Sequence, residues 1–91
     1  MGILTVAALG TALLGMTSAA NAESLGRPCT NAPQAQWLPL ASLQAKVEAL
    51  GYKVQKAKLK KACGEFYAID KNGKKVEIFV DPTSGAVVGQ L

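Results

Sequence analysis

An apolar run near the N-terminus limits what this chain can fold into, because it takes residues out of the folded domain. Residues 3–16 carry no charged side chain and lead to Ala20-Asn21-Ala22, a small-residue site of the type that signal peptidase cleaves. The run of about 14 residues is shorter than the roughly 20 that a membrane-spanning helix needs, so an uncleaved anchor is the weaker interpretation. We predict a signal peptide over residues 1–22 and a periplasmic or secreted mature chain of 69 of the 91 residues.

A mature chain of this size buries only a thin core. Ordering it costs roughly 1.5 kcal/mol per residue, and apolar burial barely offsets that cost. The sequence contains two cysteines, Cys29 and Cys63, and an exported chain meets conditions that permit disulfides. A bridge between them closes a loop of about 35 residues, which the chain-entropy treatment values at roughly 3.5–4 kcal/mol. We therefore expect a Cys29–Cys63 disulfide.

The composition argues against catalysis and metal binding. The sequence has no histidine and no Cys-x-x-Cys pair, which excludes Ser-His-Asp and Cys-His catalysis and removes the usual ligands of zinc. Glu65, Glu77 and Asp81 are not spaced as a paired acid–base site, and a small chain leaves little room for a substrate pocket. We expect no enzyme activity, no metal and no cofactor, and we interpret these carboxylates as charges on strand surfaces.

The beginning of the mature chain is predicted to be an arm without regular structure. Residues 23–37 contain Gly26 and Pro33 but show no apolar period, which is typical of an extended segment. Cys29 would pin this arm to the domain. We expect Trp37 to pack at the end of the arm, where the domain of residues 38–91 begins.

A helix is predicted over about residues 39–50. Pro39 suits the first helical turn, where its missing N–H is not needed, and Gly51 suits a helix end because it readily adopts a positive φ. The apolar residues between them are spaced by three or four positions and form one stripe, made of Leu40, Leu43, Val47 and Leu50.

After Gly51 the apolar pattern changes from helical to alternating spacing. This alternation predicts strands over residues 52–61, 65–70 and 74–80, with a short final strand over 86–88. Asp70-Lys71-Asn72-Gly73 predicts a hairpin turn between the second and third strands. The fold class is therefore α+β: one helix packed on a three- to four-stranded antiparallel sheet, with an extended N-terminal arm pinned by a disulfide.

The register of this hairpin decides which strand residues face the helix. A two-residue loop puts Tyr67 and Ile69 on the face of Ile78, whereas a type I turn with Gly73 in a bulge puts Phe66 and Ala68 there. Asp at the first turn position and Gly at the fourth favour the bulged turn. In that register the face opposite the helix keeps three large apolar residues, which we nominate as partner-binding candidates: Tyr67, Ile69 and Phe79. The alternative is that the arm folds over this face and buries it.

A row of lysines follows the first strand and supplies three more partner-binding candidates: Lys56, Lys58 and Lys60. With a net charge of +4 the chain would be attracted weakly to anionic surfaces, and salt screens this attraction beyond about 8–10 Å. We expect no nucleic-acid binding, because no aromatic side chains interleave with the lysines. The preferred interpretation of the row is an edge strand whose charges prevent edge-to-edge pairing.

Five segments of the chain together carry a resemblance to a known family. They are Trp37-Leu38, Leu50-Gly51-Tyr52, Cys63-Gly64-Glu65-Phe66-Tyr67-Ala68, Asp70-Lys71-Asn72-Gly73-Lys74 and Val80-Asp81-Pro82-Thr83-Ser84-Gly85. These segments resemble PepSY domains, in particular the small stand-alone exported PepSY proteins of bacteria, and the similarity covers about residues 29–90. The resemblance implies a helix on an antiparallel sheet, a binding role and no catalytic residues, since PepSY units occur in propeptides of thermolysin-like peptidases and in envelope sensor and membrane proteins.

Two functions are therefore expected. The first is an exported, non-catalytic regulatory module that binds a protein partner in the cell envelope, with modulation of a peptidase as its specific form. The second is an accessory subunit of a membrane sensor or redox complex.

Overall fold

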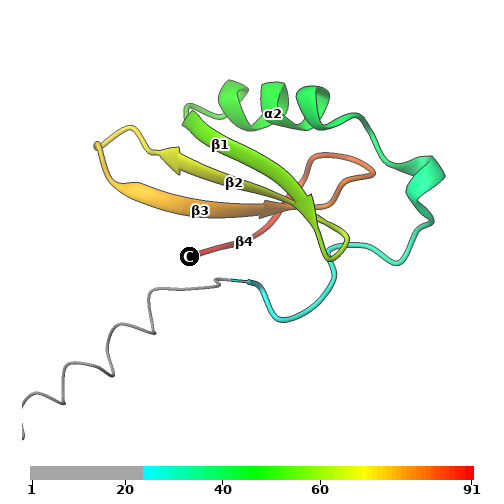
Figure 1. Cartoon of the computed structure of the whole chain (residues 1–91). Coiled ribbons are helices and arrows are strands. Elements are labelled where there is room, and N and C mark those ends of the chain that lie inside the picture. Colours follow the sequence, from blue (N-terminus) through cyan, green and yellow to red (C-terminus); the bar gives the residue numbers. More distant parts are fainter. Residues whose placement is uncertain (1–23) are drawn as a thin grey trace, which may run out of the picture.

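The computed structural model describes residues 24–91, so the predicted signal peptide lies outside the described residues. One helix covers one face of a four-stranded antiparallel sheet with strand order β1-β2-β3-β4 (Figure 1). This arrangement confirms the predicted α+β fold. The elements are the 3₁₀ helix η2 (Gln34–Gln36), the helix α2 (Leu40–Ala49), and the strands β1 (Lys53–Lys60), β2 (Cys63–Ile69), β3 (Lys75–Val80) and β4 (Val87–Gln90).

The helix α2 lies over β1 and β2 and covers the main core. Leu43 and Val47 are fully buried, as the apolar stripe predicts. Pro39 has an extended backbone, with φ −61° and ψ 148°, and its carbonyl accepts the N–H of Leu43, so the helix begins one residue later than predicted. Leu50 was expected in the stripe but is 54% exposed, because the helix ends at Ala49 and the chain turns at Gly51, where φ is +104°.

The β2–β3 hairpin has the bulged register that the turn residues favour. Gly73 has φ +83° and its N–H donates to the carbonyl of Asp70, while the Asp70 carboxylate accepts the N–H groups of Asn72 and Lys74. Pairing of Phe66 with Ile78 follows from this turn. The buried residues of the helix side are Leu43, Val47, Phe66, Ala68, Val76, Ile78 and Val80.

Strand ends differ from the predicted ranges by one or two residues. Lys61 and Ala62 both have positive φ and form the two-residue turn between β1 and β2, so β1 ends at Lys60 and β2 already begins at Cys63. Gly64 belongs to β2 and faces the helix. A Cβ there would lie 2.8 Å from Cγ2 of Val80, so the close packing of β2 and β3 under α2 requires glycine at this position.

The arm passes from the helix side around the β1–β2 turn to the lower face of the sheet, where it is drawn in cyan in Figure 1. The Cys29–Cys63 disulfide fixes it there, as predicted. The arm is not wholly extended, because it contains η2, which the sequence analysis missed. Trp37 follows η2, is half-buried, and donates its indole N–H to the carbonyl of Ala32 at 3.0 Å.

Candidate partner-binding face

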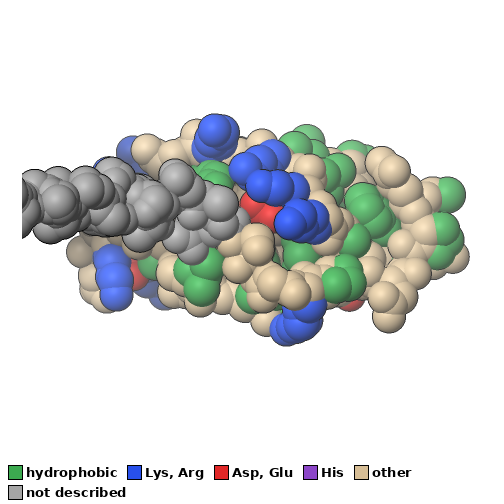
Figure 2. All heavy atoms as spheres, turned by 60° about the horizontal axis from the view of Figure 1, so that its bottom comes forward, with side chains coloured by type: hydrophobic (Ala, Val, Ile, Leu, Met, Phe, Trp, Pro, Cys, Tyr) green, Lys and Arg blue, Asp and Glu red, His purple; other side chains and the backbone are tan. Residues whose placement is uncertain are grey.

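The sheet face turned away from α2 carries the candidate site, and we call it the open face. In an antiparallel pair, residues opposite each other lie on the same face. Strand pairing places Lys56 opposite Tyr67 and Lys58 opposite Glu65, and it places Tyr67 opposite Glu77 on β3. Figure 2 shows this side of the molecule, where lysine groups gather around an acidic side chain near the centre and apolar patches lie beside them.

One end of the open face is covered by the arm. Phe79 is 0% exposed and packs with Cys29, Cys63 and the half-buried Leu25. This burial corrects the expectation that Phe79 is an exposed contact residue. At this end of the sheet the arm folds over the open face and buries it, which was the alternative stated in the sequence analysis.

The other end of the open face stays partly accessible around Tyr67, which is half-buried. The Nζ atoms of Lys56 and Lys58 lie 5.9 and 5.5 Å from the centroid of the Tyr67 ring. An ammonium group within about 6 Å of an aromatic ring is attracted by the negative face of the ring. The ring therefore holds two positive charges close to one another on an accessible surface.

The two carboxylates of the strands are buried, which the sequence analysis did not anticipate. Glu65 is 1% exposed and Glu77 is 5% exposed. Oε1 of Glu65 has no hydrogen-bond donor but lies 4.0 Å from Nζ of Lys58. A buried carboxylate is costly unless a positive charge compensates it, so Glu65 favours a position of Lys58 close above the sheet. Lys58 is thus held by both Glu65 and the ring of Tyr67.

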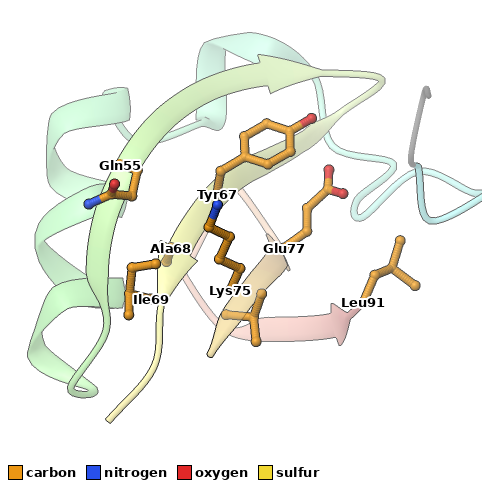
Figure 3. Close-up of a pocket in the computed structure, with 8 residues that line it drawn as sticks. Gln55, Tyr67, Ala68, Ile69, Lys75, Glu77 and Leu91 are labelled. Atoms are coloured by element: carbon orange, nitrogen blue, oxygen red, sulfur yellow. The ribbon is translucent and has the colours of Figure 1, made fainter. Parts of the chain in front are cut away.

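A hollow of about 460 Å³ opens beside Tyr67, between β1, the end of β2 and β3. Figure 3 shows the side chains around it, among which Ile69 and Leu91 supply apolar surface and Lys75 supplies a positive charge. The complete lining is Gln55, Tyr67, Ala68, Ile69, Lys75, Val76, Glu77 and Leu91. A hollow that is open to solvent and mostly apolar suits a side chain of a binding partner.

The structure thus brings most of the nominated residues together. Tyr67, Ile69, Lys56 and Lys58 share the accessible part of the open face. Lys60 lies on the same face but opposite Cys63, at the end that the disulfide occupies.

The sequence analysis nominated two residues of the hollow, Tyr67 and Ile69, and missed the others, among them Lys75, Gln55 and Leu91. The alternation of Lys75 with Glu77 along β3 was a signal that could have identified Lys75. Gln55 sits in a bulge between Val54 and Lys56, and no sequence signal marks that bulge. Leu91 joins the site through paired backbone hydrogen bonds with Glu77.

Within residues 24–91, no group of three or more Cys, Asp or Glu residues is placed to hold a metal ion. In the same part of the chain, no helix is long and apolar enough to cross a membrane. The open face carries a mostly apolar hollow with the positive charge of Lys75 at its edge.

Comparison with known proteins identifies a family. The sequence profile of a PepSY family, described as the peptidase propeptide and YPEB domain, matches residues 5–90, which is nearly the whole chain. The match begins within the predicted signal peptide. No curated protein and no solved structure matches significantly.

Proposed function

Because the chain belongs to the peptidase propeptide and YPEB domain family, we propose that it is an exported binding module that regulates a protein partner in the cell envelope. PepSY domains are generally non-catalytic, and a binding role agrees with the family. Export is supported by the apolar run before Ala22 and by the Cys29–Cys63 disulfide, since such bonds persist in oxidising compartments.

The observation that carries the proposal is the accessible part of the open face. The arm covers Phe79 at one end of the sheet, yet it leaves Tyr67 and Ile69 partly accessible next to the hollow. Aromatic and aliphatic residues beside a concavity are typical anchors of protein interfaces.

Modulation of a peptidase is the specific form of this function that we favour. The family description names peptidase propeptides, which are segments that act on the peptidase to which they belong. A separate chain of the same fold could bind a peptidase in the same manner. If the captured partner is a membrane sensor or redox protein instead, the accessory role replaces the peptidase role.

The test is capture of the partner by the purified, disulfide-bonded protein from the envelope fraction of the cells that make it. Ile69→Asp should abolish capture, because it places a charge next to the hollow. Leu50→Asp is the matched control: Leu50 is 54% exposed on the helix side, and its replacement should leave capture unchanged. Circular dichroism must show the same melting temperature for the variants and the parent protein.

The captured protein then decides the form of the function. A peptidase whose activity falls when the purified protein is added would support peptidase modulation. Retention of the same partner by Ile69→Asp would contradict the assignment of the open face.

A further inference from the structure

The strands present mainly positive charge to solvent. Their charged residues comprise five lysines and two glutamates, and both glutamates are buried. The lysines are exposed or half-buried: Lys53, Lys56, Lys58, Lys60 and Lys75. The formal charges partly cancel, but a partner that approaches the sheet meets mainly the ammonium groups.

One row across the sheet places an apolar residue between two of these lysines. Ile69 on β2 pairs with Lys53 on β1 and with Lys75 on β3. Paired residues of antiparallel strands lie on one face, so the three side chains stand in line on the open face. Lys53 and Lys75 are exposed, and Ile69 lies at the hollow.

An extended chain that crosses the strands can span this row, because flexible lysine side chains cover the few Å by which the two spacings differ. Lys53 and Lys75 are two strands apart, which is roughly 10 Å. In an extended segment, side chains on one side recur every two residues, or roughly 6.7 Å. An aliphatic side chain above Ile69 would therefore place the side chains two residues before and after it within reach of the two flexible lysines.

We propose that the open face binds an extended acidic segment of its partner, in which one aliphatic residue is flanked by carboxylates two positions away on each side. The aliphatic side chain enters the hollow beside Tyr67 and Ile69, and the carboxylates pair with Lys53 and Lys75. Lys56, held over the ring of Tyr67 in the neighbouring row, adds a third positive charge beside the path. The inference rests on the proposed function and specifies the chemistry of the partner.

The test is an NMR titration of the isotope-labelled, disulfide-bonded protein with short synthetic peptides. The first peptide has the core Glu-Ser-Leu-Ser-Glu, and its comparisons replace both Glu by Gln, both Glu by Lys, or Leu by Gly. The acidic peptide should shift the amide signals of Ile69 and Lys75 in a saturable way. Each of the three comparison peptides should bind more weakly. The Gln-flanked peptide should lose about two- to fivefold for each exposed charge pair removed, the Lys-flanked peptide should lose more because like charges repel, and the Gly peptide should lose affinity because it has no side chain to enter the hollow.

Matched lysine variants locate the contact. Lys53→Gln and Lys75→Gln should each weaken binding of the acidic peptide about two- to fivefold at low salt, and less at physiological salt. Lys46→Gln removes the same charge from α2, on the other side of the sheet, and should leave binding unchanged. Lys58 is not replaced in any variant, because without it the buried Glu65 carboxylate would have no nearby positive charge from Lys58.

Three results would overturn the inference. The first is that the Lys-flanked peptide binds as tightly as the acidic peptide, and the second is that Lys46→Gln weakens binding as much as Lys53→Gln and Lys75→Gln do. The third is that vesicles of anionic phospholipid broaden the NMR signals in a way that depends on Lys53 and Lys75, while the peptide causes no shifts. The last result would make the face a membrane surface. If Ile69→Asp loses the captured partner but the acidic peptide does not bind, this inference fails and the proposed function stands.

Discussion

Among single residues, Phe79 and Tyr67 show how position along one sheet face sets the role of an aromatic side chain. Both residues point away from α2. Phe79 is enclosed by Leu25 and the disulfide, whereas Tyr67 lies beyond the arm and contacts solvent and two lysines. The first side chain therefore contributes to stability, and the second is available for binding.

Replacement of Phe79 tests this division. Phe79→Ala should lower the free energy of unfolding by about 3–5 kcal/mol, because it removes a buried ring and leaves a cavity under the arm. Tyr67→Ala should cost much less, since its ring is only half-buried. Urea unfolding followed by circular dichroism measures both variants. A loss at Tyr67 as large as that at Phe79 would contradict the assignment of the two rings.

At the scale of elements, α2 is attached to the sheet by one narrow stripe. Leu43 and Val47 fill the space above β1 and β2, while Leu50 lies past the last helical turn. The stripe is short because the helix has ten residues, and few buried positions carry most of its packing. The stability of the helix therefore depends on tertiary contacts more than on its own propensity.

Two identical substitutions separate buried from exposed positions on this element. Leu43→Ala should destabilise the protein by about 3 kcal/mol or more, as large-to-small changes do in a filled core. Leu50→Ala should cost less than about 1 kcal/mol, because the side chain is 54% exposed. Thermal and urea unfolding of both variants gives the comparison. Equal losses would mean that α2 is rotated relative to the packing described.

The whole molecule consists of two apolar clusters on opposite faces of one sheet. The larger cluster lies under α2, and the smaller one lies under the arm around Phe79 and the disulfide. The covalent bond holds the arm in place together with the packing of Leu25 on Phe79 and the hydrogen bond from the N–H of Cys29 to the carbonyl of Ala62. Removing the bond should therefore affect the smaller cluster first.

Loss of the disulfide is the corresponding prediction. The double variant Cys29→Ser/Cys63→Ser should be less stable by about 2–5 kcal/mol, since the bond limits the entropy of the unfolded chain. Hydrogen exchange of amides near Phe79 should accelerate more than exchange in β2 opposite α2. Uniform acceleration would show that the arm does not protect the smaller cluster separately.

Export is a prediction about the whole chain. If signal peptidase cleaves after Ala22, the protein isolated from its native compartment should begin at Glu23. Intact-mass measurement and N-terminal sequencing decide this directly. A cytoplasmic protein that retains residues 1–22 would contradict the proposed localisation, although the fold of residues 24–91 would stand.

The sequence by itself determined the features that local chemistry encodes. The spacing of Leu43 and Val47 predicted the helix, and Asp70 and Gly73 predicted the bulged turn, because side-chain period and turn conformation depend on neighbouring residues. The hairpin register then assigned Tyr67 and Phe79 to the same face. These signals were sufficient for the fold class and for most residues of the candidate face.

Only the tertiary structure decided which part of that face is accessible. The path of the arm buries Phe79, and Glu65 is buried while its cross-strand neighbour Lys58 stays partly exposed. The bulge at Gln55 and the position of Leu91 complete the hollow. Each of these depends on contacts between segments far apart in the chain, and such contacts leave no periodic signal in the sequence.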